Sequence, residues 1–216
     1  MVSGHGTTRF MSPVPRLIVG ISGASGVIYG IRMLETLRSL AVESHLVMSR
    51  AAELTLAAET DQTLDAVRSL ATVWYRAGDV GAAIASGSFQ ALGMVVAPCS
   101  VRSMSEIATG ITSTLLTRAA DVTLKERRRL VLMVRETPLH LGHLRTMVAL
   151  AEIGAVIAPP VPAFYGRPAT LEAVVDHSVG RVLDQFGFDS GRFRRWDGRN
   201  PAEARFGAAA AAGEDS

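Results

Sequence analysis

The sequence has little of what marks a secreted, membrane-spanning or nucleic-acid-binding protein. It contains one cysteine, Cys99, which excludes an intrachain disulfide and fits a reducing compartment. No apolar run reaches the ~18 residues that cross a bilayer, and residues 1–15 lack the apolar core of a secretion signal. The net charge is only +2, although the sequence pI is near 9.1, so no nucleic-acid surface is indicated. We therefore expect a cytoplasmic protein with no membrane or nucleic-acid partner.

Motifs that hold metal ions are also lacking. There is no DDxxD-like carboxylate pair that would bind magnesium on a diphosphate. His140 and His143 stand in HLGH without an added carboxylate, which is a poor metal site. Cys99 ends a predicted strand and has no obvious histidine partner, which is typical of a small buried residue and not of a nucleophile. We expect the protein to hold no metal.

What the sequence has is the composition of one folded domain. Its 216 residues are 48% hydrophobic and 19% charged, which is ordinary for a globular protein with a sizeable core. We predict a single domain over residues 16–200. A mobile N-terminal extension (1–15) and a mobile C-terminal tail (201–216) flank it.

Short apolar strands alternate with amphipathic helices along this domain. Strands are predicted at 17–21, 44–49, 92–99, 130–134 and 155–159, and helices from Val27, at 50–59, 113–127, 139–154 and 170–186. Residues 100–110 are predicted as a loop turning into a short helix, and 60–90 show no clear pattern. The alternation indicates an α/β fold with a parallel sheet covered on both faces, whose ligands bind beyond the carboxyl ends of the strands.

The first strand leads into its helix through a glycine-rich turn, RLIVGISGASGVIYG (16–30). The free N–H groups at a helix start favour an anion. The spacing of Gly20, Gly23 and Gly26 is not the dinucleotide fingerprint, no Gly-Lys-Ser/Thr follows, and Val27 stands where a nucleophile elbow needs glycine. A monophosphate such as that of a flavin mononucleotide remains. The turn is equally consistent with a tight connection that binds nothing.

Polar residues also follow the later strands. Ser100 and Ser103 lie just past the third predicted strand, Arg135 and Glu136 past the fourth, and Tyr165 past the fifth. Polar groups at three ends of otherwise apolar strands are hard to attribute to folding alone. They indicate a ligand site at that edge of the sheet.

Six segments, in order, resemble the UbiX-type flavin prenyltransferases: GISGASGVIYGIRML, HLVMSRAAELTLAAET, APCSVRSMSEIATG, LLTRAADVTLKERR, VRETPLHLGHL and PPVPAFYGRP. The resemblance runs from about Arg16 to Trp196. It implies a flavodoxin-like, Rossmann-like three-layer sandwich with a mostly parallel sheet, assembled as a homododecamer. It also implies transfer of a dimethylallyl group from dimethylallyl monophosphate to N5 and C6 of reduced FMN. The prenylated FMN would then serve a UbiD-type decarboxylase. Members were formerly described as decarboxylases of the ubiquinone pathway.

The resemblance implies site residues, carried over position by position. FMN would be contacted by Gly23, Ala24, Ser25, Ser49, Ser100, Val101, Arg102, Ser103 and Arg135. The dimethylallyl phosphate would be bound by Tyr165 and Arg181, helped by Arg118 and Lys125. Glu59 and Glu136 would lie by the prenyl-transfer centre, and Trp196 would form an aromatic lid.

Two positions depart from the family pattern. Arg129 stands where relatives usually carry proline, and Gly166 stands where a histidine often follows the tyrosine. Neither removes a residue with an expected role, but both would alter the rim of the site.

The residue types suit the implied chemistry. Breaking the carbon–oxygen bond of an allylic monophosphate leaves a phosphate dianion, which needs fixed cations and hydrogen-bond donors. Arg118 and Lys125 are seven residues apart and share one helix face, and arginine can hold phosphate without magnesium. This favours a monophosphate donor and a metal-independent reaction. Ring closure at C6 releases a proton, which Glu136 or the departing phosphate would take.

Two other functions stay open on the sequence. One is an FMN-dependent decarboxylase of the phosphopantothenoylcysteine decarboxylase type, which would not need the phosphate group formed by Arg118, Lys125, Tyr165 and Arg181. The other is a flavin carrier without catalysis, which would not need Glu59 or Glu136. Arg118 and Lys125 also suit a solvated helix face, since Asp121 and Glu126 lie beside them.

Overall fold

The computed structural model describes residues 14–193, 195 and 196. The predicted N-terminal extension, apart from Val14 and Pro15, and the predicted C-terminal tail lie outside these residues. The strands are β1 (Arg16–Ile21), β2 (Glu43–Met48), β3 (Val73–Tyr75), β4 (Gly93–Cys99), β5 (Arg129–Val134) and β6 (Ala155–Ile157). The α-helices are α1 (Val27–Ser39), α2 (Arg50–Glu59), α3 (Leu64–Leu70), α4 (Val101–Ala108), α5 (Leu115–Lys125), α6 (Leu141–Glu152) and α7 (Leu171–Asp184). Two short 3₁₀ turns, η1 (Ala83–Ala85) and η2 (Phe164–Gly166), complete the elements.

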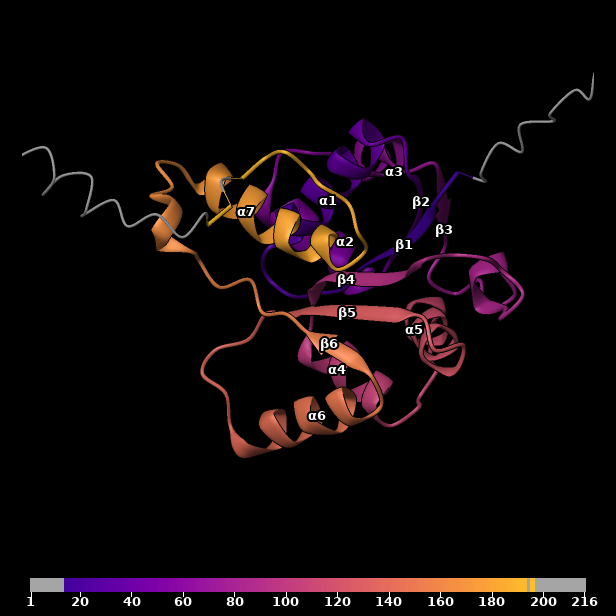
Figure 1. Ribbon diagram of the computed structural model, residues 1–216. Coiled ribbons are helices and arrows are strands. Elements are labelled where there is room, and N and C mark those ends of the chain that lie inside the picture. The colour runs from indigo at the N-terminus through magenta and orange to yellow at the C-terminus, as the bar shows by residue number, and fades with distance from the viewer. Residues whose placement is uncertain (1–13, 194, 197–216) are drawn as a thin grey trace, which may run out of the picture.

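The strands form one six-stranded parallel sheet that separates two layers of helices (Figure 1). Helices α1, α2, α3 and α7 cover one face, and α4, α5 and α6 cover the other. Successive side chains of a strand point to opposite faces, so β1 sends Leu17, Val19 and Ile21 to the first layer and Ile18 to the second. The continuous apolar runs of the sequence follow from this burial on both sides. The predicted three-layer α/β sandwich is confirmed.

The strand order is β3-β2-β1-β4-β5-β6. Without the three-residue edge strand β3, the order is that of a flavodoxin-like sheet. The order reverses between β1 and β4: after β1 the chain adds β2 and β3 on one side, and it then returns to add β4, β5 and β6 on the other side. The helix that follows β1 covers one face and the helix that follows β4 covers the other. By the general rule for open α/β sheets, the region beyond the carboxyl ends of these two strands is the expected ligand crevice.

Most predicted elements are confirmed within one or two residues, and α2 matches its prediction at both ends. Gly154 has a φ of +99°, the left-handed conformation expected just after a helix. The loop predicted before the helix at 100–110 was wrong, because the side chain of Ser100 caps α4 and the helix begins at once at Val101. Residues 60–90, left without a prediction, form α3, β3 and η1. No helix among the described residues is long and apolar enough to span a membrane.

Candidate active site

A buried serine joins the carboxyl ends of β1 and β4. The Ser22 hydroxyl donates to the carbonyl oxygen of Pro98 over 2.9 Å and accepts from the N–H of Ser100 over 2.7 Å. The N–H of Ser22 donates to the same carbonyl over 3.1 Å. These bonds fix the crevice where the strand order reverses. Ser22 was not among the predicted site residues, and its place beside Gly23 in the glycine-rich turn was the only signal for it.

The glycines of the turn are required by backbone conformation and by packing. Gly26 has a φ of +98°, which favours glycine, and it caps α1. At Gly23, a Cβ atom would lie 2.2 Å from the Cβ of Ala51, so this glycine lets the turn pack against the start of α2. The close packing against Ala51 therefore explains why residue 23 is glycine, without requiring a bound ligand.

The carboxylate of Glu59 occupies the start of α1. Its oxygens accept from the N–H of Gly26 over 2.8 Å and 3.1 Å and from the N–H of Val27 over 3.0 Å. The turn was expected to bind an anion, and the Glu59 carboxylate is the anion bound at the N–H groups of Gly26 and Val27. Any phosphate must use other donors at this edge.

The electrostatic environment keeps Glu59 ionised. Partial burial pushes the pKa of its carboxyl upward. That effect is outweighed by hydrogen bonds from the Ser25 hydroxyl and from the N–H groups of Gly26 and Val27, together with the charge of Arg135. The pKa of Glu59 therefore lies below its usual value. Glu59 is therefore a fixed negative charge near Arg135. Its predicted position by the reaction centre is consistent with this location at the carboxyl edge.

Three serines with predicted flavin contacts lie at helix starts of the same edge. The Ser49 hydroxyl accepts from the N–H of Ala52 over 3.1 Å and caps α2. The Ser100 hydroxyl accepts from the N–H of Ser103 over 3.2 Å and lies 3.2 Å from its hydroxyl. Helices α1, α2 and α4 all begin at this edge, and the small residues Gly26, Ser49 and Ser100 stand at their starts. The residues present therefore fit a phosphate-bearing group such as FMN.

The other predicted flavin contacts are less closely tied to this crevice. Ala24 lies within the turn between Gly23 and the exposed Ser25, and Val101 is the first residue of α4. The guanidinium of Arg102 pairs with Glu106 over 2.8 Å, and 81% of its side chain is exposed. This pairing faces solvent, so Arg102 shows no contact that would orient it toward the crevice.

Arg135 and Glu136 follow directly on β5, as predicted. Both are exposed, and the N–H of Arg135 donates to the carbonyl of Cys99 over 3.0 Å. The N–H of Thr137 donates to the Glu136 carboxylate over 2.9 Å. Burial raises the pKa of Tyr29, and the charge of Arg135 opposes that rise, so Arg135 lies near both Tyr29 and Glu59. Arg135 therefore lies near Glu59, and Glu136 follows it in the chain.

A second group of predicted residues meets in a cavity of about 570 Å³. Its lining combines Tyr165 from η2, Arg181 from α7 and Trp196 from the segment after α7, with His177, Phe193 and Arg195 between them. The rings of Tyr165 and Trp196 meet edge to face, with their centroids 5.7 Å apart. The predicted donor residues Tyr165 and Arg181 and the predicted lid Trp196 are therefore brought together by the fold.

Acidic residues hold the arginines of this cavity in place. Arg181 pairs with Asp184 over 2.8 Å, and Arg195 pairs with Asp184 over 2.6 Å and with Asp189 over 3.2 Å. Asp184 is 15% exposed and Arg181 is 54% exposed. The guanidinium of Arg181 is thus anchored on one side and open to a ligand on the other. We refer to this group as the donor pocket: Tyr165, His177, Arg181, Phe193, Arg195 and Trp196.

Arg118 and Lys125 do not join the donor pocket within one chain. Both lie on α5, on the face of the sheet opposite α7 (Figure 1). Arg118 pairs with Asp121 over 2.9 Å, and Lys125 pairs with Glu126. The sheet separates the two helices, so a single chain does not gather all four residues expected to bind the phosphate.

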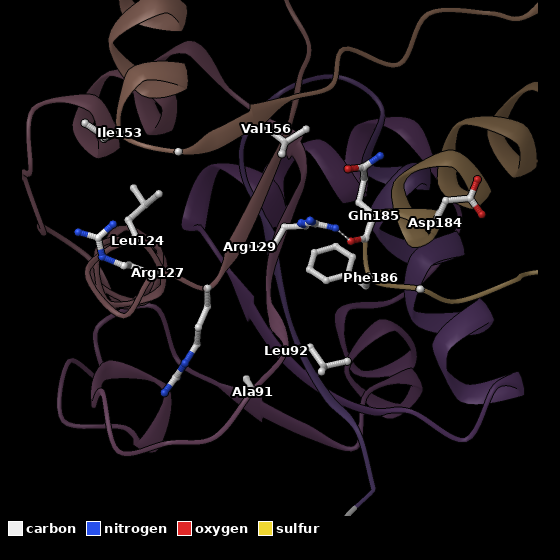
Figure 2. Close-up of a pocket in the computed structure, with 13 residues that line it drawn as sticks. Ala91, Leu92, Leu124, Arg127, Arg129, Ile153, Val156, Asp184, Gln185 and Phe186 are labelled. Atoms are coloured by element: carbon white, nitrogen blue, oxygen red, sulfur yellow. Dashed lines mark hydrogen bonds between the residues drawn. The ribbon is translucent and has the colours of Figure 1, made fainter.

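The described surface has a larger cavity, which is lined in part by Asp184, the partner of Arg181 and Arg195. It measures about 990 Å³ and is lined by residues at the amino ends of β4, β5 and β6 and at the end of α7. Figure 2 shows Arg129 reaching across it to the carbonyl oxygen of Gln185. Arg129, one of the two departures from the family pattern, therefore joins β5 to the end of α7. Gly166, the other departure, lies in η2 and leaves open space beside Tyr165.

Two negative expectations bear on the chemistry. Among residues 14–193, 195 and 196, no group of three or more His, Cys, Asp or Glu side chains is placed to hold a metal ion. Complete burial raises the pKa of the Cys99 thiol to about 12, so it stays protonated. The interpretation of Cys99 as a small buried residue agrees with this burial.

The donor pocket includes residues that the sequence analysis missed. His177, Phe193 and Arg195 were not predicted. The position of His177 one helical turn before Arg181 was the only available signal, because i and i+4 share a helix face. Phe193 and Arg195 lie in an irregular segment, where spacing predicts no shared face.

Comparisons with known proteins identify the family of the chain. The Flavoprotein family model matches residues 6–183. A flavin prenyltransferase UbiX of Escherichia coli K12 is 61% identical, over 85% of this chain and 98% of the relative. The crystal structure of AnUbiX (PadA1) in complex with FMN and dimethylallyl pyrophosphate has a TM-score of 0.85 at 49% identity, covering 87% of this chain and all of that one.

A second solved structure, a dodecameric FMN-dependent UbiX-like decarboxylase from Escherichia coli O157:H7, has a TM-score of 0.83 at 46% identity. It covers 84% of this chain and 99% of that one. Matches of this extent, together with the strand order and the crevice described above, show that the chain belongs to the Flavoprotein family and, within it, to the UbiX flavin prenyltransferases.

Proposed function

We propose that this chain transfers a dimethylallyl group from dimethylallyl monophosphate to N5 and C6 of reduced FMN. The observation that carries the proposal is the donor pocket, in which Tyr165, Arg181 and Trp196 meet at one opening. The relative with 61% identity is a flavin prenyltransferase, and a structural neighbour binds FMN and a dimethylallyl phosphate ester. Both support the same chemistry for this chain.

The donor pocket suits an allylic phosphate at both of its ends. Arg181 offers a guanidinium that remains 54% exposed, and its fork matches phosphate oxygens. The hydroxyl of Tyr165 lies beside it and adds a hydrogen-bond donor. The indole face of Trp196 suits the positive charge that develops on the allyl group when the carbon–oxygen bond breaks.

FMN would lie over the carboxyl ends of β1 and β4. Ser25, Ser49, Ser100 and Ser103 would offer hydroxyl groups, and Arg135 would offer a positive charge. FMN supplies the nucleophilic nitrogen and carbon that accept the dimethylallyl group. The protein orients the two substrates and keeps water from the allyl group.

The carboxylates of Glu136 and Glu59 would accept a proton and balance charge, respectively. Glu136 follows Arg135 directly, so in an extended segment the two side chains point to opposite sides. Glu136 would accept the proton that C6 releases when the second carbon bond forms, and the departing phosphate keeps the electrons of the broken bond. Glu59 is held ionised at the start of α1 and would balance the charge near the flavin.

A monophosphate donor is proposed although the neighbouring structure holds a pyrophosphate. Diphosphate donors are commonly held through magnesium by paired carboxylates of the DDxxD type, and the sequence has no such motif. A monophosphate needs only the arginines and the tyrosine. Comparing the two donors with purified protein, with and without a chelator, tests this point.

We propose assembly as a homododecamer, with sites completed by neighbouring subunits. Helix α6 packs on the sheet through its inner face, and its outer face exposes the apolar residues Leu141, Leu144 and Val148. A neighbouring subunit would bring Arg118 and Lys125 to the donor pocket, since the sheet separates them from it within one chain. The dodecameric neighbour supports this expectation.

The place of the reaction in the cell is also proposed. The prenylated FMN would pass to a UbiD-type decarboxylase, and a link to ubiquinone synthesis would follow where that decarboxylase serves it. A single buried cysteine supports a cytoplasmic location.

Incubation with reduced FMN and dimethylallyl monophosphate tests the proposal. Mass spectrometry of the released flavin is expected to show the added five-carbon unit. A flavin of unchanged mass would refute it. A decarboxylase of the phosphopantothenoylcysteine type or a flavin carrier would give that negative result, and release of carbon dioxide from a thiol-bearing carboxylic acid would separate those two.

A further inference from the structure

His177, Phe193 and Arg195 line the donor pocket but have no role in the proposed function, and His177 is the one that contacts Tyr165. His177 lies on α7, one turn before Arg181, and its Nε2 atom is 2.8 Å from the hydroxyl of Tyr165. The two rings meet edge to face with centroids 5.6 Å apart, and Phe193 packs against the other side of the imidazole at 4.9 Å. Two aromatic contacts therefore fix the direction of the histidine ring.

The bond between Tyr165 and His177 is not needed to satisfy a buried group. Tyr165 is 46% exposed, so water could pair with its hydroxyl at little cost. The bond instead decides where the hydroxyl proton points. If Nε2 accepts, the tyrosine proton is directed at His177 and only oxygen lone pairs face the pocket. If Nε2 carries a proton and donates, the tyrosine O–H is free to turn toward a ligand.

A phosphate dianion distinguishes these two arrangements, because its oxygens accept hydrogen bonds and do not donate. Oxygen lone pairs of Tyr165 would repel it, whereas the O–H would bind it. Burial, followed by the charge of Arg181, lowers the pKa of His177, and Asp184 opposes this effect. The free imidazole is therefore neutral near neutral pH, and either of its nitrogens can carry the single proton.

We propose that His177 is a positioning residue for the phosphate of the dimethylallyl donor: it donates from Nε2 to Tyr165 and so turns the tyrosine hydroxyl toward the phosphate. The inference rests on the proposed function of the donor pocket and deepens it. Arg181 supplies charge, and the pair of His177 and Tyr165 supplies direction. The charged and titratable groups around the imidazole are Tyr165, Arg181, Asp184 and Arg195.

A double-mutant cycle on donor affinity tests the inference. The affinity of the full chain for dimethylallyl monophosphate is measured by calorimetry, with FMN bound, in the wild type, His177→Phe, Tyr165→Phe and the double variant. Phenylalanine keeps the ring contacts of His177 but cannot donate. His177→Gln is the matched rescue, because its amide can donate to Tyr165 without carrying charge.

The two single phenylalanine variants should each lose about tenfold in affinity, as expected for a hydrogen bond to a charged group. The double variant should lose no more than either single, and His177→Gln should stay within about threefold of the wild type. FMN affinity and the melting temperature should not change. If His177→Phe proves unstable, His177→Leu is measured in its place.

Losses that multiply to about a hundredfold in the double variant would overturn the positioning role, since independent residues add in free energy. Donor affinity of His177→Phe equal to that of the wild type would overturn it as well. These results are distinct from a failure of the proposed function, which would appear as a wild type that binds no donor and forms no prenylated flavin.

Discussion

The two halves of the site are built in different ways. The crevice at the ends of β1 and β4 is joined by backbone groups and short side chains of the central strands, with Ser22 buried between them. The donor pocket uses exposed side chains of a 3₁₀ turn, α7 and the segment that follows. The crevice is therefore part of the folding core, whereas the donor pocket lies on peripheral elements. Changes in the first should affect stability and flavin binding, and changes in the second should affect donor binding alone.

The largest effect on stability is expected in the crevice, at Gly23→Val. A Cβ at this position would lie 2.2 Å from the Cβ of Ala51 and 3.0 Å from its backbone carbon. We expect a loss of about 3 kcal/mol or more in the free energy of unfolding, because an overpacked backbone contact cannot relax easily. The contact with Ala51 supports the alternative interpretation of this turn as a tight connection, beside the predicted flavin contact at Gly23. Urea denaturation measures the effect, and an unchanged unfolding midpoint would contradict the close packing of this turn.

Ser25→Tyr changes the same turn without that clash. Ser25 is exposed, so the variant should keep its fold and lose FMN affinity by about a hundredfold, because the large ring would fill the space above the helix starts. Flavin absorbance after gel filtration measures occupancy, and circular dichroism controls for folding. A variant that retains stoichiometric FMN would remove Ser25 from the flavin site.

Glu136→Gln separates catalysis from binding at the edge of the crevice. The amide keeps the shape of the side chain but cannot take a proton, so prenylated product should form about a hundredfold more slowly. Affinities for FMN and for the donor should stay near those of the wild type. Single-turnover mass spectrometry gives the rate. Turnover at the wild-type rate would show that Glu136 does not accept the C6 proton and would favour the departing phosphate as the acceptor.

Arg181→Ala tests the donor pocket alone. Because this guanidinium is exposed and pairs, among the described residues, with Asp184 alone, its loss should weaken donor affinity by about tenfold and leave the fold and FMN affinity unchanged. Calorimetry with each ligand in turn makes the comparison. A loss of FMN from this variant would show that Arg181 belongs to the flavin site, and the contrast between the two regions would fail.

The smallest effect is expected at Glu59→Gln. The carboxylate caps α1 through the N–H groups of Gly26 and Val27, but it is exposed, so its loss should cost about 0.5–1 kcal/mol of stability at neutral pH. Since the folded pKa of Glu59 is lowered, this contribution is present above the ordinary value of 4.5 and is lost as the pH falls through the lowered pKa. Unfolding midpoints of both proteins should therefore converge in acid. A constant difference at all pH values would show that the charge has no part in the cap.

Local patterns in the sequence predicted most of the fold correctly. The apolar runs of β1, β4 and β5 are buried on both faces, as is typical of strands in a covered parallel sheet. The pattern failed at 60–90, where β3 has three residues and α3 has seven, because elements this short contain too few repeats to show a period.

The sequence alone gives the order of the candidate site residues along the chain but not their arrangement in space. The sequence by itself determined that small hydroxyls follow β4, that Arg135 and Glu136 follow β5, and that Tyr165, Arg181 and Trp196 occur near the end of the domain. Each of these depends on local order along the chain. Only the tertiary structure decided that the Glu59 carboxylate binds the N–H groups at the start of α1 and that Gly23 packs closely against Ala51. It also decided that the sheet separates Lys125 from Arg181. Those outcomes depend on contacts between residues distant in the sequence, and such contacts are set by how helices pack across a sheet and not by any local period.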